Sequence, residues 1–303
     1  MTILDSGIDP DHIDLVGKVD LTNSATFVTS SPCGAADTAS FVDRRWHGTF
    51  VASQITTNNV GIAGVAPLTT VVGVKVFRCD GTGSFADIIA GILYAASLED
   101  VDIINLSLGA WLLKNTPGGG ALVSALNAAV NFANSQGKLV VSAAGNDALN
   151  LDRDKSGTSV PAQSGAAISI YATDLSDDLA SYSNFGRSGT WVGAPGGDFP
   201  NPHAPLPGCL LDPALQSVII GACSSASLVM PCGPGSYLIG IGTSFAAPLV
   251  AGVAALVDGK ASNAGALNGG QLKTILSKTA DLGRQGVDID FSHGRVDAAN
   301  AVR

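Results

Sequence analysis

Apolar residues are distributed along the chain in short segments with two different periods. Short, mostly apolar runs of the length typical of buried strands lie at residues 2–4, 71–77, 101–108, 138–143 and 167–172. In other segments apolar residues return every three or four positions, the spacing of one helix face, which predicts helices at residues 47–55, 85–98, 121–134, 244–257 and 271–278. Strands that alternate with helices are typical of right-handed βαβ units, so the pattern predicts an α/β fold with a mostly parallel central sheet.

Two long segments carry neither period and are predicted to be irregular. Residues 22–45 are small and polar, and residues 176–240 are rich in Gly, Pro and Ser. The chain shows no internal repeat and no linker composition. We therefore expect one domain spanning residues 1–303.

Composition narrows the classes of function. Hydrophobic residues make up 46% of the 303 residues and charged residues only 14%, so extended disorder is not expected. The net charge of −9 argues against a nucleic-acid partner, because phosphates require a basic surface. The longest apolar region, Ala246–Val257, contains Pro248 and Gly252 and is shorter than the roughly 20 apolar residues of a membrane span. No membrane partner is predicted.

The cysteines bear on the compartment in which the protein works. There are five, an odd number, with no CxxC spacing and no close Cys/His cluster that would indicate zinc. Scattered disulfides in an exported enzyme are favoured over reduced thiols in a cytosolic one. The chain begins MTILDSGID, with no basic segment and no apolar segment of a signal peptide. Either an export signal has been removed or the protein stays inside the cell, and the sequence leaves both open.

Polar residues at the ends of predicted strands are candidates for chemistry, because α/β sheets place functional groups at the carboxyl ends of their strands. Asp5 ends the first strand, Ser107–Gly109 end another, and Asn146 follows the strand after that. An Asp buried at a strand end needs a hydrogen-bond partner. Asn146 could supply an amide donor, although a residue of a turn is its ordinary interpretation.

Two further candidates open helices. His47 starts the helix at residues 47–55, and Ser244 follows Gly242 at the start of the helix at residues 244–257. Each alone is more simply interpreted as a helix cap. A nucleophile at Ser244, however, would have the unpaired N–H groups of a helix N-terminus beside a developing oxyanion.

Taken together, these candidates resemble one family. Asp5 in LDSGID, His47 in HGTFVA, Asn146 in SAAGN and Ser244 in GTSFAAP resemble, in this order, the subtilisin-like serine proteases (subtilases, peptidase family S8). Further similar motifs, covering nearly the whole chain, are GVAP at 64–67, VKV at 74–76, DGTGS at 80–84, NLSLG at 105–109 and GRVDAANAV at 294–302. The resemblance implies a single three-layer α/β domain of the subtilisin type.

The resemblance also implies a mechanism, that of a serine endopeptidase working through an acyl-enzyme. Ser244 would attack the peptide carbonyl, His47 would carry its proton to the leaving amine, and Asp5 would hold the imidazole. Asn146 and the backbone N–H of Ser244 would bind the oxyanion. No cofactor would be needed for catalysis.

By the same resemblance, two segments would flank an extended polypeptide substrate, with side chains or backbone from Gly81, Thr82 and Gly83 and from Ser107, Leu108 and Gly109. The second segment, with Ala143, Ala144 and Gly145, would wall the primary specificity pocket. These walls are uncharged, so we expect an apolar or aromatic P1 residue. A secreted monomer, regulated by a prodomain or a protein inhibitor, is the corresponding expectation.

The chain departs from the family pattern at several positions. Phe50 and Ser53 replace the His and Gly of HGTHVAG, and Phe245 and Leu249 replace the Met and His of GTSMAxPH. Only four residues precede Asp5, whereas subtilases usually carry a longer segment there, besides a signal and an inhibitory prodomain.

That longer segment helps to form a calcium site in the family. Asp14 and Asn59 would correspond to its ligands here, with plain turn residues as the alternative.

If the topology is that of the family, Cys33 and Cys79 converge near the rim of the site and form a disulfide. Cys223 and Cys232 could close a hairpin by a second, which leaves Cys209 unpaired. Five reduced thiols are the alternative.

Two other functions are alternatives to an endopeptidase. One is an inactive subtilase fold that binds peptide, and the intact Asp5, His47, Asn146 and Ser244 argue against it. The other is an esterase or related acyl hydrolase, whose usual Gly-x-Ser-x-Gly turn is absent around Ser244.

Overall fold

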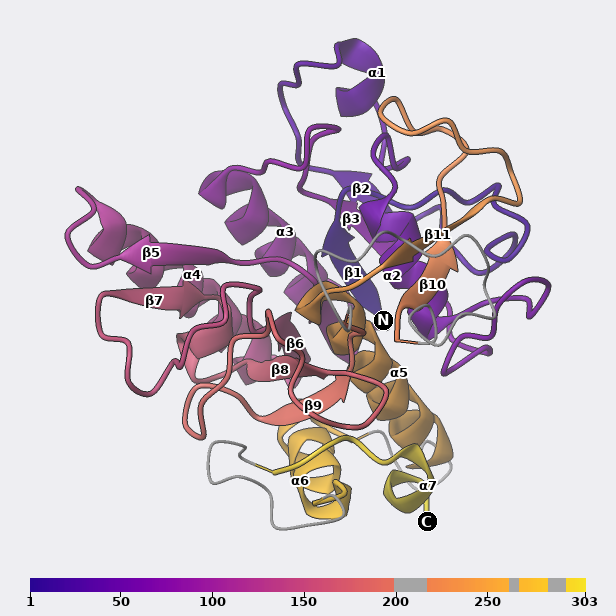
Figure 1. Cartoon of the computed structure of the whole chain (residues 1–303). Coiled ribbons are helices and arrows are strands. Elements are labelled where there is room, and N and C mark those ends of the chain that lie inside the picture. Colours follow the sequence, from indigo (N-terminus) through magenta and orange to yellow (C-terminus); the bar gives the residue numbers. More distant parts are fainter. Residues whose placement is uncertain (199–216, 262–266, 283–292) are drawn as a thin grey trace.

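A parallel sheet of seven strands forms the middle of the computed structural model, which describes residues 1–198, 217–261, 267–282 and 293–303 (Figure 1). The strands follow the order β2-β3-β1-β4-β6-β8-β9, and every neighbouring pair is parallel. Their bounds are β1 Thr2–Asp5, β2 Ala25–Thr26, β3 Val72–Lys75, β4 Ile103–Leu106, β6 Leu139–Ala143, β8 Ile168–Thr173 and β9 Val192–Pro195.

Helices cover both faces of this sheet (Figure 1). On one face α2 (His47–Ile55) packs beside α5 (Thr243–Ala261), and on the other α3 (Phe85–Ser97) packs beside α4 (Gly119–Ser135). The shorter helices are α1 (Ala35–Thr38), α6 (Gly269–Thr279) and α7 (Ala298–Ala301), of which α6 and α7 contact α5.

Alternating strand residues supply the two cores. In β6, Leu139, Val141 and Ala143 join the apolar cluster around α5, whereas Val140 joins the cluster around α3 and α4. Because strand side chains point alternately to the two faces, a strand buried on both sides must be apolar throughout. The predicted α/β fold with a parallel sheet between two helical layers is therefore confirmed.

Two antiparallel pairs lie outside the central sheet. One joins β5 (Ala110–Leu113) to β7 (Gly157–Val160), and the other joins β10 (Ile219–Ala222) to β11 (Tyr237–Gly240). A single turn of 3-10 helix, Ala162–Ser164, follows β7.

The two segments predicted to be irregular do contain elements. Residues 22–45 hold β2 and α1, and residues 176–240 hold β9, β10 and β11, so that expectation was wrong. Each of these elements has only two to four residues, too few to show a period, and its strands form because a neighbouring strand is in place. The antiparallel pair formed by β5 and β7 was missed for the same reason.

Among the described helices, α5 is long and apolar enough to cross a membrane by length and composition alone, with a mean hydropathy of 1.3 over 18 residues. In this fold 56% of its most apolar 18-residue stretch is buried, and the helix packs against β4, β6, β8 and β9. It is thus a core helix, and it presents Ser244 near its first turn.

Two disulfides confirm the predicted pairings. Cys33 is bonded to Cys79, which joins the segment before α2 to the segment after β3, and Cys223 is bonded to Cys232 after β10. Cys209 lies outside the described residues.

The order of the strands determines where the site lies. After β1 the chain adds β3 on one side of it, and it then crosses to add β4 on the other side. The order in which strands are added to the sheet therefore switches direction between β1 and β4, which are parallel neighbours. Such a switch point leaves a crevice at the carboxyl ends of the strands. Asp5 ends β1 there, and Ser107 follows β4.

Candidate active site

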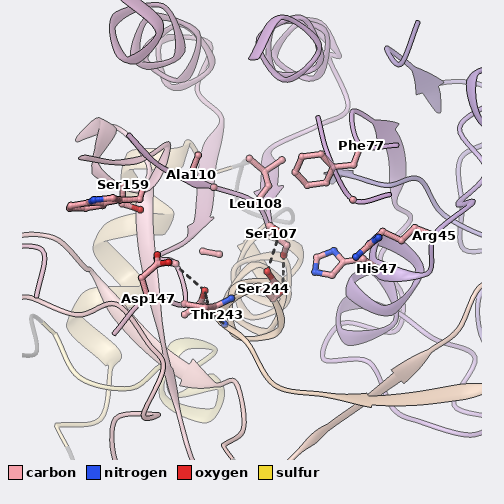
Figure 2. Close-up of a pocket in the computed structure, with 16 residues that line it drawn as sticks. Arg45, His47, Phe77, Ser107, Leu108, Ala110, Asp147, Ser159, Thr243 and Ser244 are labelled. Carbon is pink, nitrogen blue, oxygen red and sulfur yellow. Dashed lines mark hydrogen bonds between the residues drawn. The ribbon is translucent and has the colours of Figure 1, made fainter. Parts of the chain in front are cut away.

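A cavity of about 390 Å³ opens at the carboxyl ends of β3, β4 and β6 (Figure 2). Nine of the predicted site residues line it, namely His47, Gly81, Ser107, Leu108, Gly109, Ala143, Gly145, Asn146 and Ser244. Asp5 lies beneath His47 and is fully buried. The fold therefore gathers residues from five separate chain segments around one cavity.

His47 and Asp5 form a close pair at the bottom of this cavity. The Nδ1 atom of His47 lies 2.8 and 2.9 Å from the two carboxylate oxygens of Asp5. Because a carboxylate only accepts, Nδ1 donates and Nε2 is left without a proton in the neutral ring. In the described part of the chain Nε2 makes no hydrogen bond, and it is therefore available as a base.

The Asp5 carboxylate controls the protonation of His47. Burial by itself lowers the pKa of His47, but the charge of Asp5 and its hydrogen bond to the ring outweigh burial. The charge of Asp43 adds to them, so the pKa of His47 is raised above its usual value. A positive imidazolium, which proton transfer from a nucleophile would create, is stabilised by the same contacts.

A second buried carboxylate, Asp43, holds the start of α2. It accepts hydrogen bonds of 2.7–3.0 Å from the Ser6 hydroxyl, from the N–H and hydroxyl of Thr49, and from the N–H groups of the two residues before His47. Burial raises the pKa of Asp43, and these donors oppose that effect. The arrangement acts as a helix cap and positions the first residue of the helix, His47.

Gly48 permits the close approach of α2 to the end of β1. A Cβ at Gly48 would lie 2.0 Å from the carbonyl oxygen of Gly7 and 3.1 Å from the Cβ of Asp5. The Gly48 N–H donates to the Ser6 hydroxyl at 2.9 Å. Any side chain at this position would push His47 away from Asp5.

Ser244, the second residue of α5, is held to Ser107 by two hydrogen bonds. The Ser107 hydroxyl donates to the Ser244 carbonyl at 2.7 Å, and the Ser244 hydroxyl donates to the Ser107 carbonyl at 3.2 Å (Figure 2). Pro248, one helical turn later, lacks the N–H that would otherwise bond to the Ser244 carbonyl. The Ser244 hydroxyl is therefore directed to Ser107, and within the described residues it makes no hydrogen bond to His47.

Two hydrogen-bond donors converge beside Ser244. The Asn146 Oδ1 atom accepts from the N–H and the hydroxyl of Thr243, each at 2.9 Å, which leaves Nδ2 as the free end of the amide. The Nδ2 atom of Asn146 and the backbone nitrogen of Ser244 both lie 3.7 Å from the position that a Cβ on Gly242 would take. Neither donor has an acceptor within the described residues, and together they can receive a developing oxyanion.

Three predicted substrate residues do not line the cavity within the described structure. The Thr82 hydroxyl is engaged with Asp80, at 2.7 Å, and with Arg78. Gly83 is covered by the Phe77 ring, and Ala144 is fully buried in the core. Of the segment 81–83, Gly81 alone lines the cavity.

Several lining residues were not predicted. They are Arg45, Phe77, Ala110, Trp111, Asp147, Ser159 and Thr243. Two of these, Arg45 and Asp147, are sequence neighbours of His47 and Asn146 and carry charge, which is a signal that the sequence did offer. Trp111 and Ser159 come from the unpredicted pair β5 and β7.

The departures from the family pattern pack beneath the site. The rings of Phe50 and Phe245 lie 4.1 Å apart, and the Phe245 ring lies 5.6 Å from the His47 ring. The Ser53 hydroxyl donates to the Phe50 carbonyl and accepts from the Ala222 N–H, which ties α2 to β10. Leu249 packs against the core around α5. These residues change the support of His47 and remove no reacting group.

The residues predicted to hold calcium do not fit a cation. The Asp14 carboxylate accepts from the N–H groups of Val60, Gly61 and Ile62 at 2.7–3.2 Å and from the Tyr237 hydroxyl at 2.7 Å. These donors direct positive dipoles to the place where a cation would bind.

Asn59 is also engaged, because its Oδ1 atom accepts from the Thr57 hydroxyl at 3.1 Å. Among the described residues no cluster of three or more His, Cys, Asp or Glu side chains is placed to hold a metal. The calcium expectation therefore has no support in this loop.

Comparison with known proteins agrees with the geometry of the site. The family model described as "Subtilase family" matches residues 1–294. The thermophilic serine proteinase of Bacillus sp. (strain AK1) is 33% identical, over 100% of this chain and 61% of that protein. The extracellular protease of Xanthomonas campestris pv. campestris is 36% identical, over 83% of this chain and 38% of that protein. Thermitase of Thermoactinomyces vulgaris is 30% identical, over 100% of this chain and 88% of that protein.

Solved structures give the same result. A lanthipeptide protease superposes with a TM-score of 0.80 at 27% identity, covering 100% of this chain and 86% of that one. An epidermin leader peptide processing serine protease from Staphylococcus aureus superposes with a TM-score of 0.84 over 99% of this chain and 74% of that one, and at 23% identity it shows a shared fold. The chain spans 61% and 38% of the first two curated relatives, so it corresponds to a part of those proteins.

Proposed function

Because this chain belongs to the subtilase family, we propose that it is a serine endopeptidase that hydrolyses peptide bonds through an acyl-enzyme intermediate. The observation that supports this most strongly is the convergence of a paired imidazole, a hydroxyl and two free donors on one cavity. His47 is hydrogen-bonded to Asp5 at 2.8 Å, and it lines the same cavity as Ser244 and Asn146. Figure 2 shows His47 and Ser244 in that cavity.

In the proposed reaction Ser244 is the nucleophile. Its hydroxyl rotates from the Ser107 carbonyl toward Nε2 of His47, which takes the proton as Oγ attacks the substrate carbonyl carbon. The Asp5 carboxylate stabilises the imidazolium that forms. The oxyanion of the tetrahedral intermediate is received by the Asn146 Nδ2–H and the Ser244 N–H.

The second half of the reaction uses the same groups. His47 returns its proton to the leaving amine, the C–N bond breaks, and an ester on Ser244 remains. Water then enters, gives a proton to Nε2, and attacks the ester carbonyl through a second tetrahedral intermediate. The carboxylic acid leaves, and Ser244 regains its hydroxyl proton.

The walls of the cavity support the proposed P1 preference. Between Ser107–Gly109 and Ala143–Gly145 the lining is apolar or small, and the Trp111 side chain also lines the cavity. An apolar or aromatic P1 side chain would bury its surface there. Asp147 lies at the exposed rim of this region.

We also propose that the protein works on polypeptides outside the cell, as one domain spanning 1–303. The two disulfides support an oxidising compartment, and one of the relatives is named as an extracellular protease. A monomeric state and control by a prodomain or protein inhibitor remain predictions.

Covalent labelling tests the proposal and separates it from an inactive peptide-binding fold. A fluorophosphonate probe should attach to Ser244 and should not attach to the Ser244→Ala variant. Ser97→Ala is a matched control, because Ser97 is an exposed serine on α3, remote from the cavity, and should leave labelling intact. Absence of label on the wild-type protein would indicate an inactive fold.

A further inference from the structure

The substrate cavity carries opposite charges at its two ends. Apart from His47, the charged side chains among its described lining residues are Arg45 and Asp147. Figure 2 shows Arg45 beside His47 at one end and Asp147 at the other, with Ser244 between them. The nucleophile thus lies between a cationic and an anionic end.

Arg45 is held in place by one hydrogen bond from its backbone and one from its guanidinium. Its backbone N–H donates to Asp43 at 2.9 Å, and its guanidinium donates from Nη1 to the Cys79 carbonyl at 3.1 Å. Cys79 is itself fixed by the disulfide to Cys33. This anchoring reduces the entropy that Arg45 would lose when it binds a ligand.

The guanidinium of Arg45 packs against the backbone of Gly81. A Cβ at Gly81 would lie 2.6 Å from the Arg45 Cζ and 2.9 Å from its Nε and Nη1, so any side chain here would displace the cation. Gly81 also has a φ of +83°, which favours glycine. The flat guanidinium therefore lies against the bare backbone of the segment that flanks the substrate.

The charge of Arg45 is only weakly compensated by the protein: it contributes to lowering the pKa of the exposed Asp80, and its guanidinium carbon lies 5.8 Å from the centroid of the Trp46 ring. Within the described residues no carboxylate forms an ion pair with it, and one of its five N–H donors is used, on Cys79. The side chain is partly exposed. Its charge opposes protonation of His47, although the net effect of all contacts is a raised pKa of that ring.

We infer that Arg45 makes the enzyme prefer substrates with an acidic side chain at P2, the residue that precedes P1. This inference rests on the proposed protease function. In an extended peptide, successive side chains point to opposite sides. If the P1 side chain enters the apolar region beyond Ser244, the P2 side chain points toward His47, Phe77 and Arg45 (Figure 2).

At P2, an acidic residue would place its stem on the Phe77 ring and its carboxylate on the guanidinium, which suits a planar, bidentate partner. The protein as a whole has a net charge of −9, which would disfavour anionic peptides. A preference for an acidic P2 residue must therefore come from the local charge of Arg45. No other lining cation competes for that carboxylate among the described residues.

Arg44 provides a matched control. It is the adjacent residue and carries the same charge, yet its guanidinium is turned to the carbonyls of Ala36 and Ala226, at 3.3 and 3.4 Å, and it does not line the cavity in the described structure. An effect of overall charge would be common to both arginines, whereas a P2 contact would be specific to Arg45.

The test compares kcat/KM for three chromogenic peptides that share one aromatic P1 residue and carry Glu, Gln or Lys at P2. The wild type should favour Glu over Gln by about fivefold, the scale of a partly exposed ion pair, and 1 M salt should reduce this ratio. Arg45→Gln should bring the ratio to about one, and Arg45→Glu should make the Lys peptide the best substrate. Arg44→Gln should leave the wild-type ratio unchanged.

A Glu/Gln ratio that is the same in Arg45→Gln as in the wild type would overturn the inference, as would an equal change in Arg44→Gln. Cleavage of the Gln peptide reports separately on the protease function. If that peptide is cleaved with no preference for Glu, the P2 inference alone fails. If no peptide is cleaved and no probe labels Ser244, the proposed function fails and the inference fails with it.

Discussion

Ser107 and Ser244 each donate a hydroxyl hydrogen bond to the backbone carbonyl of the other, at 2.7 and 3.2 Å. Ser107 follows β4 and Ser244 begins α5, so this pair joins the sheet to the helix that carries the nucleophile. The Asn105 amide in turn donates to the Ser107 hydroxyl at 2.9 Å. The position of Ser244 is thus set in part by a residue 137 positions away in the chain, Ser107.

Ser107→Ala should destabilise this junction and slow turnover. The change leaves the Ser244 carbonyl and the Asn105 amide without a partner, which should lower the free energy of unfolding by about 1–3 kcal/mol. Loss of the tie should lower kcat by about 10- to 100-fold through misplacement of the nucleophile. Urea unfolding and steady-state kinetics measure the two effects.

The control for that change is Ser97→Ala, since Ser97 also donates to a carbonyl, that of Tyr94 at 2.7 Å, on the exposed side of α3. It should alter neither quantity by a comparable amount. Equal effects of the two variants would mean that the bond between Ser107 and Ser244 has no special role.

Asn146→Leu should act on kcat with little change in KM. The amide donor strengthens its contact only as negative charge develops on the substrate oxygen, so its removal should lower kcat by about 10²–10³-fold, the scale typical of such donors in this family. Steady-state kinetics on one peptide substrate provide the measurement. A variant that changes mainly KM would assign Asn146 to substrate binding instead.

The pH dependence of kcat/KM should report the pKa of His47. His47 must be neutral to accept a proton, and Asp5 raises its pKa, so activity should rise with pH through a midpoint above the ordinary histidine value of 6.5. In Asp5→Asn the raising charge is gone, so the midpoint should move to lower pH. The maximal kcat should fall on the order of 10⁴-fold, because the imidazolium and its tautomer lose their support.

A midpoint that stays in place in Asp5→Asn would contradict this assignment of the acid limb. Asp147→Asn is a suitable control, because Asp147 lines the same cavity at the end remote from His47. It should leave the midpoint nearly unchanged.

Tyr237→Phe tests whether the Asp14 loop is stabilised without a cation. Burial raises the pKa of Asp14, but the Tyr237 hydroxyl and three backbone N–H groups outweigh it, so the pKa is lowered from 3.8. A carboxyl with a lowered pKa stabilises the fold fully above its unfolded value and loses that contribution as the pH falls through the folded value. The variant should therefore lose about 1–2 kcal/mol of unfolding free energy at neutral pH, and the difference should shrink below pH 3.8.

The difference in unfolding free energy between the wild type and Tyr237→Phe should be the same in buffer that contains calcium and in buffer that contains a chelator. Tyr94→Phe is the matched control, because it removes a hydroxyl bond to an uncharged carbonyl, that of Asn23 at 2.8 Å, and should show no such dependence on acid. A Tyr237→Phe deficit that calcium alters would indicate that a cation does bind there.

The sequence predicted the elements whose local pattern is strong. The helix His47–Ile55 was predicted with its observed bounds, because apolar side chains follow the helical period from its first turn. The strand Val192–Pro195 was missed, since it has four residues and depends on pairing with Ile168–Thr173. Short strands of this kind are stabilised by tertiary contacts that a local pattern does not contain.

Site residues that stand in sequence motifs could be predicted, whereas the side-chain positions of residues in loops could not. Asp5, His47, Asn146 and Ser244 stand in motifs, and the fold brings the last three to one cavity with Asp5 beneath them. Thr82 was expected to face substrate, but its hydroxyl is engaged within its own turn. The conformation of a turn depends on such local bonds, and motif similarity does not specify them.

The role of Ser244 as the nucleophile is the central claim, and hydrolysis of a chromogenic peptide by Ser244→Ala tests it most directly. The account predicts a loss on the order of 10⁶-fold in kcat relative to the wild type, with unchanged unfolding by urea, because the variant lacks the hydroxyl on which the acyl-enzyme is proposed to form. Turnover by Ser244→Ala at the wild-type rate would contradict the proposed mechanism.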